Sequence, residues 1–368
     1  MSTQPTVAKR QTRTTFAIVD ADVHATPTPA GLAPYLPDRW RGYAYGGRTR
    51  GSGADVIRMR AHGARSDSYA PSGLPPGGDP AFMAEELLDR YGTRYAIINV
   101  IGASLGPPVA PGLIEANAHA TNEWLAAEWL DRDSRWRASI HVAYELPGKR
   151  VVPEIERWTK DERFVQVGGV SMRTARPLGD VHYWDMYEAL CEYDLPLAFH
   201  PGGSPGTPPT GCGWPSYYFE DHAGFPQANP SHVASLIFNG VFDRFPTLKL
   251  IVLEGGWSWV PSVAWRLDAT WRVMRDEIPD LQRKPSEYLR DHFWFTTQPI
   301  EEPEDPDWLG DMFERSGVVD HIMYSSDYPH WDFDSPADAI PASLPEETRR
   351  KLFTKTACDL YGLSLDGA

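Results

Sequence analysis

Short apolar segments alternate with amphipathic segments along almost the whole chain. The apolar segments are nearly uninterrupted, as in the strands of a parallel sheet that helices cover. The segments between them repeat apolar residues every three or four positions, which is typical of helices. This pattern predicts eight strands. The first begins at Phe16, and the other seven occupy 95–100, 137–144, 164–172, 195–200, 248–254, 293–297 and 321–327.

Eight strand–helix units predict an α/β fold, a (β/α)8 TIM barrel. A doubly wound open sheet is the competing architecture, but the glycine-rich turn expected after its first strand is absent. A chain of 368 residues is compatible with one such barrel. We therefore expect a disordered segment over 1–14 and a single barrel domain over 15–368.

Two stretches interrupt the repeat. Residues 36–80 are rich in Gly, Arg, Ser and Pro and form an excursion after the first strand. Residues 201–230 mix Gly and Pro with five aromatic residues directly after the fifth strand. A long loop of this kind either covers a binding site or forms a surface or subunit contact, and both interpretations stay open. The aromatic residues are Trp214, Tyr217, Tyr218, Phe219 and Phe225.

Composition narrows the classes of partner. The chain has 35 Lys and Arg against 50 Asp and Glu, a net charge of −15, which argues against nucleic acid as a partner. Three cysteines are too few for a disulfide framework and fit a reducing, cytoplasmic setting. Without a signal peptide or a membrane-spanning apolar run, we expect no membrane association.

The first apolar segment ends in three ionisable residues at alternate positions, Asp20, Asp22 and His24. Alternate residues of a strand point to the same side, so all three side chains are expected to converge. Such a cluster is costly to desolvate unless a positive charge lies between its members. A divalent metal ion is the simplest candidate.

Other predicted strands also end in metal-binding residue types. His200, Glu254 and Asp327 close the fifth, sixth and eighth strands, and all strands of a barrel open at the same mouth. This mixture of nitrogen and oxygen donors suits zinc or manganese, and iron and cobalt also fit. His292 and His321 begin strands at the opposite end, and we expect them to be structural.

Four motifs together resemble the amidohydrolase-related family, which includes aminocarboxymuconate-semialdehyde decarboxylase and aromatic acid decarboxylases. The motifs are DADVH, LAFHPGG, GVFDRFPTLKLIVLEGGWSWVPSVAWRLD and YSSDYPHWD, and in order they span most of the chain. The resemblance implies a distorted TIM barrel, commonly dimeric or tetrameric, that holds one metal. The implied metal ligands are Asp22, His24, His200 and Asp327.

One position departs from that family pattern. The decarboxylases have a histidine before the double glycine of the sixth strand, where it helps to protonate carbon or activate water, whereas this chain has Glu254. A carboxylate can also move protons when its surroundings raise its pKa. At this position the chain therefore lacks the histidine of the decarboxylases.

The sequence therefore favours a metal-dependent hydrolase that acts on a small, aromatic or cyclic, carbonyl-containing substrate through a metal-activated water. Glu254, Asp327 and His200 are the expected catalytic residues, and zinc is the expected ion, with manganese as the alternative. Non-oxidative decarboxylation of an aromatic or unsaturated acid is the alternative reaction, and a metal-binding scaffold without turnover is a third interpretation. Arg173, Trp214 and His330 are expected to bind a flat, anionic substrate. We also expect a homo-oligomer.

Overall fold

The structure is a computed structural model, and it describes residues 16–43, 63–100, 103–105, 109–203, 208 and 211–365. The segment 1–14, predicted to be disordered, lies outside the described residues.

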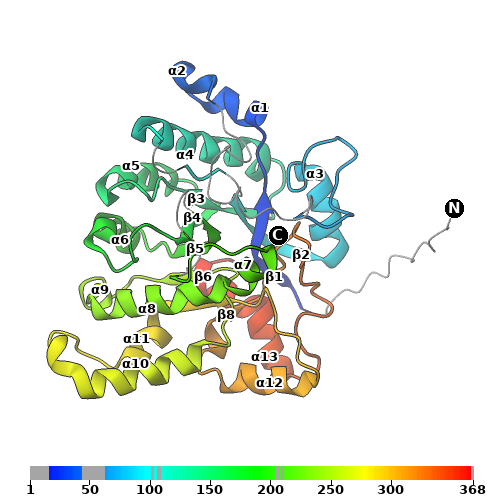
Figure 1. Cartoon of the computed structure of the whole chain (residues 1–368). Helices are drawn as coiled ribbons and strands as arrows, with labels where there is room; N and C mark the ends of the chain where they lie inside the picture. The colour runs from blue at the N-terminus through cyan, green and yellow to red at the C-terminus, as the bar shows by residue number, and fades with distance from the viewer. Residues whose placement is uncertain are drawn as a thin grey trace.

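Eight parallel strands form one sheet in which each strand pairs with the next along the chain, from β1 to β8. The sheet curls into a barrel, and the helices surround it (Figure 1). Every strand predicted from the apolar segments is present. The strands are β1 Ile18–Ala25, β2 Thr93–Val100, β3 Trp136–His141, β4 Phe164–Arg173, β5 Leu197–Gly203, β6 Leu250–Val252, β7 Phe293–Thr296 and β8 Ile322–Met323.

The barrel closes through an irregular seam between β1 and the chain that follows the short strand β8. Backbone hydrogen bonds cross this seam from Ala21 N to Tyr324 O (2.9 Å) and from Asp327 N to Asp22 O (3.0 Å). The prediction of a distorted (β/α)8 barrel is confirmed. The seam also places Asp327 directly beside Asp22.

Helices fill the connections between strands, and several begin with a proline at the first turn, where the missing amide hydrogen costs nothing. Asp79 and Asp305 cap α3 and α12 by accepting backbone N–H bonds. Within the described residues, no helix has the length and apolar character needed to cross a membrane. The helices are α1 Pro29–Leu32, α2 Asp38–Arg41, α3 Pro80–Met83, α4 Pro111–Leu125, α5 Gly148–Trp158, α6 Trp184–Glu192, α7 Tyr218–Ala223, α8 Asn229–Phe238, α9 Val241–Arg244, α10 Val260–Met274, α11 Pro285–His292, α12 Pro306–Arg315, α13 Glu346–Arg350 and α14 Thr356–Tyr361.

Among the described residues, the buried apolar side chains form three clusters, and two of these include residues of the barrel strands. The larger, which we call the outer core, packs the outward side chains of the strands against the surrounding helices. The smaller, the interior core, lies inside the barrel and includes Ala357 and Leu360 of α14, which closes the floor of the barrel. The strand residues of the interior core are Val19, Ala21, Tyr95, Ala198, Ile251 and Met323, and Leu253 joins them directly after β6.

β1 changes which side its residues face at its midpoint. Ala21 belongs to the interior core, but Val23, two residues later, belongs to the outer core, and the pairing with β2 is irregular between Asp20 and Val23. Asp20 therefore points away from Asp22. It accepts a hydrogen bond from Ser326 N (2.9 Å), and burial raises its pKa to about 8. The prediction that Asp20 converges with Asp22 and His24 is wrong, because the bulge reverses the alternation.

The described part of the 36–80 excursion contains α2 and the segment 63–79. The latter lies against the chain after β8, where Arg65 N donates to Pro329 O (2.9 Å) and Ala64 pairs with His330. The excursion thus packs beside the barrel mouth.

Candidate metal centre

The four residues predicted as metal ligands lie together at the mouth of the barrel. β1 supplies Asp22 and His24, β5 supplies His200, and Asp327 follows β8. One ligand atom from each lies within 4.8 Å of the others. Asp22, His24 and Asp327 are buried, whereas the His200 side chain keeps 21% of its surface exposed, so the cluster opens to the mouth.

Backbone carbonyls orient both imidazoles of this cluster. His24 Nδ1 lies 3.0 Å from Asn99 O, and His200 Nδ1 lies 2.6 Å from Pro201 O. Because a carbonyl oxygen only accepts, each Nδ1 carries the hydrogen, and each Nε2 presents a lone pair to the cluster. Metal-binding histidines in proteins are held in this way.

The donor atoms in the cluster fit a divalent ion. Among the described residues, Asp22 Oδ2, His24 Nε2 and His200 Nε2 are buried and lack a hydrogen-bond partner. Such atoms cost free energy unless something satisfies them. His24 Nε2 lies 2.7 Å from Asp327 Oδ1, and lone pairs this close repel unless a proton or a cation lies between them. Two imidazoles and two carboxylates are suitable ligands for a zinc- or manganese-sized ion.

The pKa of His200 also indicates that the cluster favours a positive charge. Burial lowers the pKa of His200, but the carboxylates of Asp22 and Glu254 overcome this effect and raise that pKa well above its ordinary value. The carboxylates of the cluster therefore favour a cation at this place.

Glu254 adjoins the cluster from the end of β6. Its Oε2 lies 2.9 Å from His200 Nε2, and its N–H donates to Thr296 Oγ1 (3.1 Å). Burial is the largest cause that raises the pKa of Glu254, and repulsion from the Asp327 carboxylate is the second. A carboxyl group whose pKa is raised keeps its proton to higher pH than an ordinary glutamic acid does, which suits a proton donor.

Glu254 and Asp327 share an unusual backbone conformation. Their φ angles are 46° and 59°, in the left-handed region that non-glycine residues rarely adopt. Each such residue costs roughly 1–2 kcal/mol. Strain of this kind is concentrated at functional sites, and here it turns both carboxylates into the barrel mouth.

His330 supports Asp327. Its Nδ1 donates to both carboxylate oxygens, at 2.7 and 2.8 Å, and its ring lies 4.8 Å from that of His24. Burial lowers the pKa of His330, but Asp327 raises it to about 9, and His330 in turn helps to hold the pKa of Asp327 well below its usual range. His330 therefore lies beside the cluster with Asp327 as its first partner, and its contact with a substrate stays a prediction.

Three further residues at the mouth were not identified from the sequence. Asn99 donates from Nδ2 to Asp22 Oδ1 (2.7 Å). His222 Nε2 lies 2.7 Å from Asp332 Oδ2, and with Glu254 this pair forms a further group of metal-binding residue types, besides the overlapping group of His24, Glu254, Asp327 and His330. The position of Asn99 at the end of a predicted strand was a usable signal, whereas His222 and Asp332 lie in loops whose course the sequence does not specify.

The 201–230 loop reaches the mouth through α7. Arg173, at the end of β4, forms a buried ion pair with Asp221 of α7, and His222 of α7 contacts Asp332 after β8. The guanidinium of Arg173 is therefore paired with a carboxylate of the protein itself, which does not support its predicted role in binding a substrate carboxylate. Trp214 is 43% exposed, so its predicted substrate contact receives no support from its packing.

The Arg173–Asp221 pair is expected to hold α7 at the mouth. Replacing Arg173 by methionine should leave the buried Asp221 unpaired, which is strongly destabilising for a buried charge. We expect faster amide hydrogen exchange across Tyr218–Ala223, with metal content unchanged, measured by mass spectrometry. Arg176→Met is the matched control, because Arg176 forms a more exposed pair with Asp180 (3.6 Å). Equal exchange in both variants would contradict this role.

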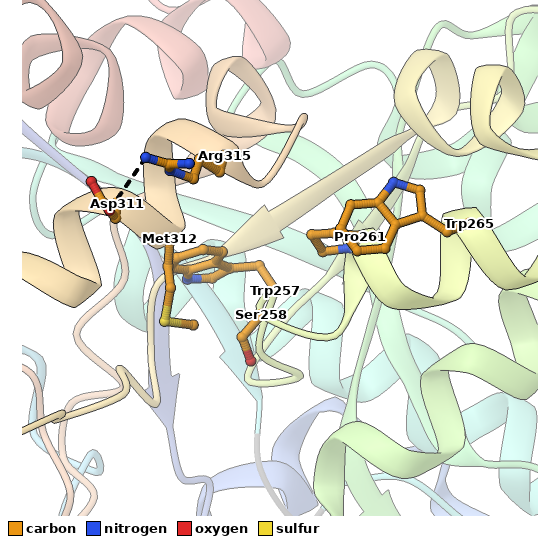
Figure 2. Close-up of a pocket in the computed structure, with 7 residues that line it drawn as sticks. All are labelled: Trp257, Ser258, Pro261, Trp265, Asp311, Met312 and Arg315. Atoms are coloured by element: carbon orange, nitrogen blue, oxygen red, sulfur yellow. Dashed lines mark ion pairs between the residues drawn. The ribbon is translucent and has the colours of Figure 1, made fainter.

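A separate pocket of about 210 Å³ lies between α10 and α12 (Figure 2). None of the candidate site residues lines it. Trp257, which follows β6, is buried there and stacks on Phe313 with ring centroids 4.2 Å apart, so it serves packing. The pocket is lined by Trp257, Ser258, Pro261, Trp265, Asp311, Met312 and Arg315.

Comparison with known proteins gives a consistent set of relatives. The sequence profile of the Amidohydrolase family matches residues 19–363. Gamma-resorcylate decarboxylases from Polaromonas sp. and Rhizobium sp. are each 26% identical to the chain, cover 84% and 85% of it, and are themselves covered over 98% and 99% of their lengths.

Solved structures show the same fold. The 5-carboxyvanillate decarboxylase of Novosphingobium aromaticivorans, in complex with manganese and 4-hydroxy-3-methoxy-5-nitrobenzoic acid, superposes with a TM-score of 0.72 at 18% identity, over 97% of this chain and 100% of that one. The dihydroxybenzoic acid decarboxylase of Polaromonas sp., with manganese and 2-nitroresorcinol, gives 0.66 at 20% identity, over 95% and 97%.

These names overturn the hydrolase interpretation. The relatives are named as decarboxylases, which agrees with the alternative reaction rather than with the favoured one. The error has a chemical cause: the same metal ligands can serve either a hydrolytic water or a substrate carboxylate, so the ligand set does not separate the two reactions.

Proposed function

The chain belongs to the amidohydrolase family, and from this premise we propose that it is a metal-dependent decarboxylase of aromatic acids that carry a hydroxyl group beside the carboxylate. The observation that carries the proposal is the cluster of Asp22, His24, His200 and Asp327, with Glu254 at its edge. The names of the relatives support the reaction: γ-resorcylate and 5-carboxyvanillate both have a phenol hydroxyl adjacent to the carboxyl group.

We propose manganese as the ion, in place of the zinc that the sequence favoured, because two relatives of the same fold are described with manganese. Asp22, His24, His200 and Asp327 would hold it. When bound, the ion would supply positive charge for the carboxylate and hydroxyl oxygens of the substrate.

Glu254 is the proposed proton donor to the ring carbon. As the carbon–carbon bond breaks, its electron pair stays on the ring, carbon dioxide leaves, and the ring carbon takes one proton. The raised pKa of Glu254 allows it to hold that proton before the reaction. After each turnover, the carboxylate regains a proton from solvent through the open side of the cluster.

His330 and α7 have supporting roles in this proposal. His330 keeps the Asp327 carboxylate ionised and fixed, so that Asp327 serves as a metal ligand and not as a proton donor beside Glu254. α7, held by Arg173 and Asp332, covers part of the mouth and limits the access of water.

A panel of benzoates tests the substrate class. The manganese-loaded protein should release carbon dioxide from 2,6-dihydroxybenzoate or another 2-hydroxybenzoate. It should not act on 3-hydroxybenzoate, whose hydroxyl group cannot reach the same ion. Carbon dioxide is measured with a coupled assay and the phenol product by chromatography. Hydrolysis of aromatic esters or amides without carbon dioxide release from any acid in the panel would refute the proposal.

A further inference from the structure

A continuous chain of hydrogen bonds runs through the interior of the barrel and ends on Asp22. Tyr361 OH donates to Gln166 Oε1 (2.8 Å), and Gln166 Nε2 donates to Ser139 Oγ (2.7 Å). Ser139 OH donates to Asn99 Oδ1 (2.6 Å), and Asn99 Nδ2 donates to Asp22 Oδ1 (2.7 Å). Every donor in the chain therefore points toward the Asp22 carboxylate.

The fold brings these residues together from distant parts of the sequence. Asn99, Ser139 and Gln166 lie on the neighbouring strands β2, β3 and β4, and Ser139 is paired with Gln166 in the sheet register. Tyr361 is the last residue of α14, the helix that closes the barrel floor. The chain thus connects the floor of the barrel with the metal ligands at its mouth.

Burial makes these polar side chains costly unless they are paired. Gln166 is fully buried, and Ser139 and Asn99 are 3% and 6% exposed. Apolar side chains would fill the same interior without needing partners, as Val19, Ala198 and Ile251 do nearby. A fully connected network, by contrast, orients its members and strengthens each hydrogen bond through the next.

Asn99 contacts both ligands that β1 supplies. Its side chain donates to Asp22, and its backbone carbonyl accepts the His24 Nδ1 hydrogen. Any change in the position of Asn99 therefore moves one oxygen and one nitrogen ligand together. Asp22 also acts on Tyr361, at the other end of the hydrogen-bond chain. Burial is the larger cause that raises the pKa of Tyr361, and the negative charge of Asp22 is the second.

We propose that Asn99, Ser139, Gln166 and Tyr361 are positioning residues that orient Asp22 and raise the affinity of the site for its divalent ion. None of the four touches the substrate in this account. The inference rests on the metal site of the proposed function but not on the reaction that the site catalyses.

The test measures manganese affinity in variants that remove one hydroxyl group each. Ser139→Ala removes the hydroxyl group in the middle of the chain and leaves only the longer contact from Gln166 Nε2 to Asn99 Oδ1 (3.3 Å) in its place. It should weaken manganese binding measurably, by up to the roughly 10–100-fold that loss of a direct outer partner of a metal ligand causes. Tyr361→Phe removes the outermost donor and should weaken binding by less. Affinity is obtained by competition with a fluorescent chelator, and electron paramagnetic resonance of bound manganese(II) should show altered ligand geometry in both variants.

Matched controls remove equivalent hydroxyl groups elsewhere. Ser316 is buried and donates to Phe313 O (2.8 Å), and Tyr187 is buried and donates to Leu178 O (2.6 Å). Ser316→Ala and Tyr187→Phe should retain wild-type affinity, while thermal unfolding of the metal-free proteins reports any general loss of stability.

Three results would count against the account, and they are distinguishable. If the wild type binds manganese and Ser139→Ala binds it equally well, the positioning role is refuted while the proposed function stands. If Ser139→Ala and Ser316→Ala lose affinity equally, the effect is one of general stability and the positioning role is again refuted. If the wild type binds no manganese, the proposed metal site itself fails.

Discussion

Replacing Glu254 by glutamine is expected to lower the decarboxylation rate by roughly 10²-fold or more while manganese remains bound. The substitution keeps the size of the side chain and removes the proton that the carboxyl group transfers, and loss of a positioned acid–base group has an effect of this magnitude. Single-turnover kinetics and metal analysis on the same sample measure both quantities. Glu314→Gln, at an exposed position of α12, is the matched control and should behave as the wild type.

Two other outcomes would change the role of Glu254. A fall in metal content together with rate would make Glu254 a ligand, which its distance of 2.9 Å from His200 Nε2 permits. An unchanged rate with metal retained would contradict its role as the proton donor.

Alanine at His24 or at His200 is expected to abolish tight manganese binding. Each substitution removes one of the two Nε2 atoms that the backbone carbonyls aim into the cluster. The loss should exceed the roughly 10–100-fold effect of removing an outer partner, because a direct ligand is gone. Dialysis against chelator and titration with manganese measure the affinity, and chelator treatment should abolish wild-type activity reversibly.

His292→Ala is the control for this prediction. His292 is also buried, but it is the last residue of α11, directly before β7, and its Nδ1 contacts Leu248 O (2.9 Å). Metal affinity should be unchanged in this variant. Retained affinity in His24→Ala, or an equal loss in His292→Ala, would show that the cluster is not the metal site.

The sequence predicted the fold well because every strand lies in a nearly uninterrupted apolar segment. A parallel barrel buries both sides of its strands, so eight apolar runs separated by amphipathic helices leave few alternative architectures. The same topology brings the ends of β1, β5, β6 and β8 to one mouth, which is why Asp22, His24, His200, Glu254 and Asp327 could be grouped from their positions. The choice of four metal ligands among these five came from the family resemblance.

What the sequence did not predict depends on local geometry. The bulge that turns Asp20 away from Asp22 leaves no mark in the alternation of residues. Arg173 finds its partner Asp221 across 48 residues of chain, through a loop whose course is not encoded in any periodic pattern. The expected homo-oligomer and cytoplasmic location stay predictions.

The interior hydrogen-bond chain also could not be predicted from the sequence. Ser139 and Gln166 lie within apolar segments, where a single polar residue has no distinguishing neighbour. Their function emerges only when β2, β3 and β4 are placed side by side and α14 is folded beneath them.

Crystals of the manganese-loaded protein, measured on both sides of the manganese absorption edge, test the central claim most directly. The account predicts one anomalous peak per chain, bonded to Nε2 of His24, Nε2 of His200 and the carboxylates of Asp22 and Asp327. A map without a peak at this position, or with its peak at His222, Glu254 and Asp332 instead, would contradict it.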